Sequence, residues 1–73
     1  SLNEMKEGQL GVIISVQGGR IAAKRLADIG LTPGTEIKII RRTLFSGPVQ
    51  IEVRGSRLVL GRGLAHRIIV EPK

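Results

Sequence analysis

The fold is decided by residues 49–60, VQIEVRGSRLVL, in the second half of the chain. Val49, Ile51 and Val53 alternate there with polar or charged residues, which is the period of a strand that buries one face. The alternation resumes at residues 57–60 after Gly55 and Ser56, a spacing typical of a two-residue hairpin turn. This segment therefore predicts two short antiparallel strands joined at Gly55.

The strand pattern extends toward the N-terminus of this hairpin. Residues 35–43 are rich in β-branched side chains, and Ile37 and Ile39 alternate with charged residues before the phase changes at Ile40. We expect a third strand with a bulge near Ile40. A loop around Gly47 would connect it to the hairpin.

Two further strands are expected at the ends of the chain. In residues 9–17 every second residue is apolar, and we expect this face to be buried, with Ile13 on the opposite face. Residues 67–71 predict the last strand, and residues 61–66 predict a single helical turn before it. The apolar face expected to be buried in the first of these strands consists of Leu10, Val12, Ile14 and Val16.

One helix is expected between the first two strands. Residues 20–29 place Ala22, Leu26 and Ile29 at i, i+4 and i+7, the spacing of a stripe that faces a core. Gly30 follows at the position where a helix commonly ends in a left-handed residue.

A tight turn follows the helix. Pro33 and Gly34 have the residue types of a type II turn, because proline fixes a negative φ and glycine supplies a positive one. Five short strands and one helix predict a mostly β fold, a small SH3-like or OB-like antiparallel barrel with one inserted short helix. We expect residues 1–73 to form one domain.

The composition limits the possible functions. The chain has 73 residues, of which 41% are hydrophobic and 25% charged, with one aromatic residue and no cysteine. Disulfides are therefore impossible, and small secreted domains commonly depend on them, which favours an intracellular protein. No apolar run approaches the roughly 20 residues that span a bilayer. We expect a cytoplasmic protein with no membrane insertion.

Catalytic and metal-binding motifs are not found. His66 is the only histidine, and the six acidic residues are scattered along the chain, so neither a catalytic triad nor a metal cage is indicated. Gly18 and Gly19 precede the predicted helix but lack the rest of a phosphate-binding fingerprint. We expect no enzyme activity, no metal ligands and no cofactor, with ferrous iron or another divalent transition metal as the alternative.

The charge favours an acidic partner. Twelve Lys and Arg residues against six Asp and Glu give a net charge of +6. Small basic barrels bind nucleic acid, but single-strand binding uses aromatic stacking platforms and Phe45 is the only aromatic residue. Binding to RNA or DNA is therefore the less favoured interpretation. Electrostatic steering onto an acidic protein is the alternative.

The chain resembles the FeoA family of bacterial ferrous iron transport proteins along nearly its whole length. The segments that carry the resemblance are 26–35 (LADIGLTPGT), 45–48 (FSGP), 53–55 (VRG) and 58–62 (LVLGR), with Leu2, Met5, Gly8, Gly11 and Ile13 before them and Ala65 and Ile68 after them. The resemblance implies an SH3-like barrel with an inserted helix. It also implies a non-catalytic accessory protein that contacts FeoB, the membrane GTPase-coupled ferrous iron transporter, through its cytosolic portions.

Two alternatives stay open beside this interpretation. One is the nucleic-acid-binding barrel, and the other is a metal-sensing module, because domains of this kind are also fused to metal-dependent repressors. Self-association is a further possibility.

A docking surface for the partner is hypothesised from large apolar residues beside rigid loops. Such side chains lose little conformational entropy when they bind. The anchors expected from the helix, from the turn after it and from the following loop are Leu26, Leu31, Pro33, Phe45 and Pro48. The glycines expected to shape the turns are Gly30, Gly34, Gly47, Gly55 and Gly61.

Overall fold

A computed structural model of the chain describes residues 1–43 and 47–73. In these two ranges the elements are the short 3₁₀ helix η1 (Leu2–Glu4), β1 (Leu10–Val16), α1 (Gly19–Asp28), β2 (Glu36–Arg42), β3 (Val49–Val53), β4 (Ser56–Leu60), α2 (Arg62–Arg67) and β5 (Ile68–Pro72). The mostly β architecture predicted by the sequence is confirmed. The single helical turn predicted before the last strand is α2.

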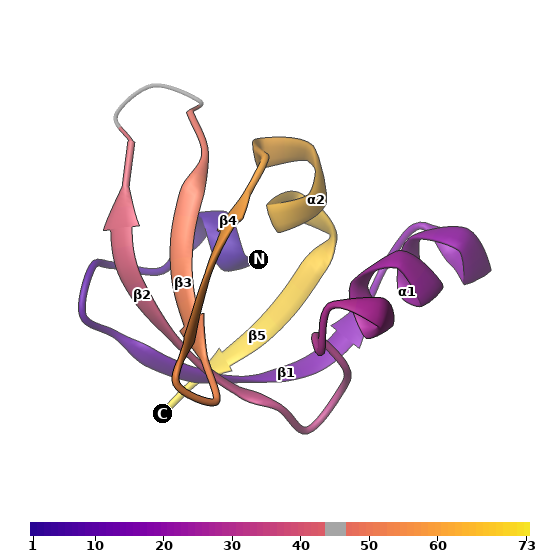
Figure 1. Cartoon of the computed structure of the whole chain (residues 1–73), viewed down its shortest axis with the longest axis horizontal. Helices are drawn as coiled ribbons and strands as arrows, with labels where there is room; N and C mark the ends of the chain where they lie inside the picture. Colours follow the sequence, from indigo (N-terminus) through magenta and orange to yellow (C-terminus); the bar gives the residue numbers. More distant parts are fainter. Residues whose placement is uncertain (44–46) are drawn as a thin grey trace.

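The strands form one curled antiparallel sheet (Figure 1). Their order in the described part of the chain is β4-β3-β2-β1-β5, so sequence neighbours are also spatial neighbours except where β5 returns to β1. The helix α2 connects β4 and β5, the two ends of that order. The bulge predicted near Ile40 is present, because the pairing of β2 with β3 shifts between Ile39 and Arg41.

The core is built from aliphatic side chains contributed by every strand. Its members among the described residues are Leu2, Met5, Ile13, Leu26, Leu31, Ile37, Ile39, Val49, Ile51, Val53, Leu60, Ala65 and Ile68. The alternation of Val49, Ile51 and Val53 is confirmed, since all three are at most 5% exposed. Burying each such side chain contributes on the order of 1.5–3 kcal/mol.

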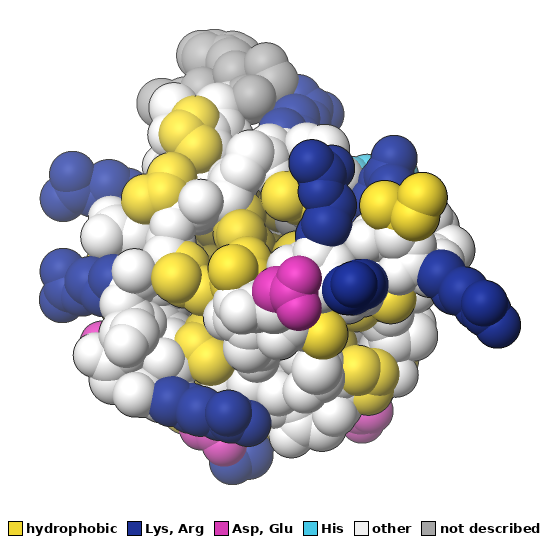
Figure 2. Space-filling model, turned by 45° about the vertical axis from the view of Figure 1, so that its right-hand side comes forward, with side chains coloured by type: hydrophobic (Ala, Val, Ile, Leu, Met, Phe, Trp, Pro, Cys, Tyr) yellow, Lys and Arg dark blue, Asp and Glu magenta, His cyan; other side chains and the backbone are white. Residues whose placement is uncertain are grey.

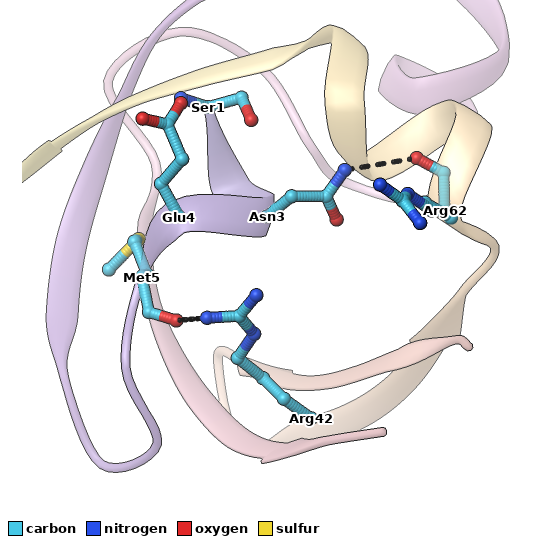
Figure 3. Close-up of polar contacts among 6 residues, drawn as sticks. All are labelled: Ser1, Asn3, Glu4, Met5, Arg42 and Arg62. Carbon is cyan, nitrogen blue, oxygen red and sulfur yellow. Dashed lines mark hydrogen bonds and ion pairs between the residues drawn. The ribbon is translucent and has the colours of Figure 1, made fainter. Parts of the chain in front are cut away.

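The N-terminal segment closes one side of this core (Figure 3). Leu2 and Met5 are buried. Two hydrogen bonds, from Asn3 and to Met5, attach this segment to the rest of the chain. The Asn3 amide donates to the Arg62 carbonyl over 3.3 Å, and the Arg42 guanidinium donates to the Met5 carbonyl over 2.6 Å. At the end of the segment, a hydrogen bond from the Ser1 ammonium lowers the pKa of the Glu4 carboxyl.

The buried face of β1 is the opposite of the one predicted. Gly11 and Ile13 face the core, whereas Leu10 and Ile14 are 40% and 51% exposed. Gly11 is packed so closely that a Cβ there would lie 2.6 Å from Val70 Cγ1 and 2.8 Å from Met5 Cε. From Leu10 to Ile14 the apolar alternation of β1 therefore marks its outer face. Val16, which follows the shift in pairing between Ile13 and Ser15, packs against the core.

The turn glycines follow the prediction at three of five positions. Gly30, Gly34 and Gly55 have φ of +89°, +91° and +82°, the left-handed values expected of them. Gly61 instead has φ of −63° and precedes α2 in extended conformation, so no glycine-specific backbone is needed there. At Gly47 the constraint is space, because a Cβ would clash with the Thr43 side chain.

The hairpin turn lies one residue earlier than predicted. Val53 pairs with Ser56, so the two turn residues are Arg54 and Gly55, with φ of +50° and +82°. Two successive positive φ values define a type I′ turn, whose twist matches that of the flanking strands.

Candidate functional site

The helix α1 projects from the side of the sheet (Figure 1), and most of its residues are exposed. Ala22 and Leu26 are its buried residues. Ile21 lies outside this stripe and is 77% exposed. The prediction that Ile29 faces the core is wrong, because Ile29 caps the end of the helix and is 44% exposed. The helix is therefore attached to the barrel by two buried side chains, and Ile21 is left exposed to solvent.

Two residues of α1 and the residue that caps its C-terminal end form one exposed ridge. Ile21, Arg25 and Ile29 are spaced by four, so they lie above one another on the helix surface. Lys24 and Asp28 flank them at i+3 positions, and all five side chains are exposed. We call Ile21, Arg25 and Ile29 the α1 ridge. It combines two apolar contacts with a guanidinium, the residue types favoured at protein interfaces.

The face that carries α1 is shown in Figure 2, where that side of the molecule is turned toward the viewer. Hydrophobic side chains lie there among many Lys and Arg side chains, with few acidic ones. Such a surface is suited to a partner that is apolar at its centre and acidic around it.

Two of the predicted anchors, Leu26 and Leu31, are wrong as docking residues because both are fully buried. The cause is the way α1 ends. The Leu31 amide donates to the Leu26 carbonyl over 2.8 Å and the Gly30 amide to the Ala27 carbonyl over 2.9 Å, which is a Schellman motif. In that motif the two residues of the longer bond pack against each other, so Leu26 and Leu31 belong to the core.

The other predicted anchors are distributed over separate parts of the molecule. Pro33 is exposed in the turn after α1, where the Thr35 amide donates to the Thr32 carbonyl over 3.1 Å and Gly34 has a positive φ. Pro48 is exposed and directly precedes β3, a strand that lies apart from α1 in Figure 1. Phe45 lies outside the described residues.

The turn at Pro33 is held firmly against the sheet. The Gly34 amide donates to the Ile13 carbonyl over 2.7 Å, and the Ile13 amide donates to the Thr35 carbonyl over 2.9 Å. The side chains of Thr32 and Thr35 share a further hydrogen bond of 3.1 Å. Pro33 is therefore presented on a rigid backbone after the α1 ridge.

The residue that sequence reasoning missed is Ile21. It precedes Ala22 and falls off the buried stripe, so periodicity alone assigned it no role. The sequence feature that could have revealed it is an isoleucine on the same surface of the ten-residue helix as its charged residues. A large apolar residue on a solvent face is a common feature of interaction sites when it lies beside other apolar residues.

The described residues also bear on metal binding and membrane spanning. No group of three or more His, Cys, Asp or Glu side chains that could hold a metal ion occurs in residues 1–43 and 47–73, and His66 is exposed on α2. Among the helices of those same residues, none has the length and apolar character needed to cross a bilayer.

Comparison with known proteins identifies the family. Residues 1–72 match the model of the FeoA domain. The chain is 39% identical over 66 residues to an Fe(2+) transport protein A from Methanocaldococcus jannaschii, covering 90% of this chain and 78% of that protein.

Solved structures agree with this match. A crystal structure of the iron uptake regulatory protein FeoA has a TM-score of 0.87 and 38% identity, covering 99% of this chain and 93% of that one. A zinc complex of FeoA from Stenotrophomonas maltophilia, described as a prokaryotic SH3 domain protein, has a TM-score of 0.81 and 26% identity, covering 96% of this chain and 87% of that one. The SH3-like barrel predicted from the sequence is thus confirmed, and the chain belongs to the FeoA domain family.

Proposed function

We propose that this chain is an accessory protein of ferrous iron uptake that acts in the cytoplasm by docking on the cytosolic portion of a FeoB-type transporter. The family match supports the role in ferrous iron transport. The observation that carries the docking surface is the α1 ridge, with Ile21 77% exposed on a projecting helix. The role is one of binding, with no catalytic step.

The ridge has the geometry of a helix that lies in a partner's groove. Residues at i, i+4 and i+8 of one helix provide successive anchors along such a groove. Burying the exposed Ile21 and Ile29 would stabilise the complex by on the order of 1–2 kcal/mol each. Arg25 between them supplies a charged hydrogen-bond donor that selects a carboxylate at the groove's centre.

The net charge of +6 acts on the rate of encounter. Long-range attraction raises association rates toward an acidic surface and weakens as salt screens it over roughly 8 Å at physiological ionic strength. We therefore expect the association rate to fall with salt, while the dissociation rate, which reflects apolar burial, changes less.

The test is a calorimetric titration of the chain with the cytosolic portion of FeoB, with and without guanine nucleotide and at two salt concentrations. Ile21→Ala should raise Kd about tenfold, equivalent to about 1.4 kcal/mol. The matched control is Val59→Ala, because Val59 is also β-branched and 67% exposed but lies on β4. Its Kd should equal that of the parent chain.

Two results would contradict the proposal. Absence of binding under all four conditions would remove FeoB's cytosolic portion as the partner. If both variants lose affinity equally, or if neither loses affinity, binding does not depend specifically on the α1 ridge.

A further inference from the structure

The outer face of β1 carries an exposed apolar strip that the docking surface on α1 does not use. Leu10 and Ile14 are 40% and 51% exposed, and Val12 between them is half-buried. The surface is hollowed on both sides of this strip. A hollow of about 410 Å³ lies toward β2 and is lined in part by Leu10, and one of about 280 Å³ lies toward β5 and is lined in part by Val12 and Ile14.

Charged residues flank the strip in two rows. Directly paired residues of antiparallel strands project from the same face, so the register locates each side chain. Lys38 pairs with Leu10, and Lys73 lies on the other side of Leu10, where its amide donates to the Leu10 carbonyl over 2.9 Å. Glu36 and Glu71 both pair with Val12. One row is therefore lysine, leucine, lysine and the next is glutamate, valine, glutamate.

The same alternation of sign continues on β3. Glu52 pairs with Lys38 and belongs to the first row, and Arg54 follows two residues later. Along each of β2, β3 and β5, outward residues two positions apart thus carry opposite charges. The three pairs are Glu36 with Lys38, Glu52 with Arg54, and Glu71 with Lys73.

This pattern is complementary to itself. A two-fold axis lying in the plane of the face, perpendicular to β1 at the level of Gly11, exchanges the two rows. Lys38 then meets Glu36 of the second copy, and Lys73 meets Glu71 of the second copy. Within one chain the Lys73 ammonium pairs with the Glu36 carboxylate over 2.7 Å across β1, so dimer formation exchanges this ion pair for the intermolecular ones. Leu10 meets Val12 of the second copy at the centre. Every charged contact joins opposite signs, as the isologous interface of a two-fold dimer requires.

The face is also where two basic chains repel each other least. The four charges that flank the strip on β2 and β5 cancel, although the chain carries +6. Arg41, opposite Gln50, and Arg57, opposite Glu52, project from the same side of the sheet but lie farther from the strip. Beyond about 8 Å the excess positive charge is screened at physiological ionic strength.

We propose that this outer face of β2, β1 and β5 binds a second copy of the same chain. A specific interface covers about 800 Å² per partner, which is about one sixth of this chain's surface of 4756 Å². No residue of the α1 ridge belongs to the face. The dimer and the docking of α1 on a transporter are therefore independent, and either is testable without the other.

The test uses two charge-reversed variants. Lys38→Glu with Lys73→Glu makes all four flanking positions acidic, and Glu36→Lys with Glu71→Lys makes all four basic. The parent chain should rise from its monomer mass of 7.9 kDa toward twice that value with concentration in sedimentation equilibrium. Each variant alone should remain monomeric, and an equimolar mixture of the two should again approach the dimer mass.

A matched control excludes an effect of net charge. Lys6→Glu with Lys24→Glu changes the net charge by the same amount at two exposed positions outside the face. This control should self-associate like the parent. It should pair with the basic variant more weakly than the acidic variant does, because only half of its charged contacts would join opposite signs. A monomeric parent at millimolar concentration, variants that dimerise alone, or a mixture that stays monomeric would each overturn the proposal.

A second measurement needs no substitution. On dilution of the parent chain, the amide resonances of β1, β2 and β5 should shift with concentration, whereas those of α1 should not. Concentration-dependent shifts confined to α1 or β4 would assign self-association to another surface and overturn the proposal. Far-UV circular dichroism checks that each variant used in the mixing experiment is folded.

Discussion

For a single residue, exposure separates the side chains that hold this fold from those available to a partner. Leu26 and Leu31 are fully buried by the Schellman motif at the end of α1, whereas Ile21 is 77% exposed on the same helix. These residues are all large and aliphatic, so composition cannot distinguish them. The position of Gly30 does distinguish them. When a helix ends in a left-handed glycine, the residue directly after the glycine packs against the residue five positions before it.

Leu31→Ala should therefore lower the free energy of unfolding by about 2–5 kcal/mol, because it removes a buried side chain and leaves a cavity. A domain of this size has on the order of 4–11 kcal/mol in total, so the loss is severe. Urea denaturation measures it. Ile21→Ala is the matched comparison and should change the free energy by at most about 0.5 kcal/mol. A stable Leu31→Ala chain that fails to bind FeoB would instead restore Leu31 as a docking anchor.

Among the elements, β1 shows most clearly what a pattern cannot reveal. Its apolar residues alternate as predicted, but Leu10 and Ile14 point outward, because Gly11 and Ile13 fill the space inside, and only Val16 packs against the core. Alternation predicts that one face is apolar without saying how closely the opposite strands approach. The pairing of β1 with β5 also shifts between Ile13 and Ser15, a bulge that no turn residue announces.

The hairpin of β3 and β4 offers a prediction at the same scale. Arg54 has φ of +50° at the first position of a type I′ turn, a conformation that costs most L-residues about 1–2 kcal/mol and that asparagine adopts readily. Arg54→Asn should raise the free energy of unfolding by roughly 0.5–1 kcal/mol, measured by urea denaturation in dilute solution. Arg57→Asn, in the adjoining strand, should give no such gain. An unchanged or lower stability for Arg54→Asn would contradict the assigned turn.

For the whole molecule, much of the architecture could be predicted from the sequence, whereas the surface could not. The strands, the helix and its glycine end follow from local periodicity and from backbone conformations that few residues adopt. Which apolar residues face water depends on contacts between segments far apart in the chain. Leu2 and Met5, for example, complete the core from the N-terminus, more than 30 residues before Ile37, Ile39 and Ile51.

The charge of the whole molecule is likewise arranged by topology. The sequence shows a net charge of +6, but only the strand register reveals that half of the acidic residues lie on one outer face beside an apolar strip. We therefore propose two distinct binding faces on the described surface, the α1 ridge for an acidic partner and the outer sheet face at β1 for a second copy.

The most direct test of the central claim is a residue-by-residue map of the contact with the transporter. Isotopically labelled chain is titrated with the unlabelled cytosolic portion of FeoB, and the amide resonances are followed. The account predicts that Ile21, Arg25 and Ile29 and the turn at Pro33 shift or broaden first, in proportion to saturation. Saturable changes confined to other surfaces, or no change at concentrations that saturate the calorimetric signal, would contradict it.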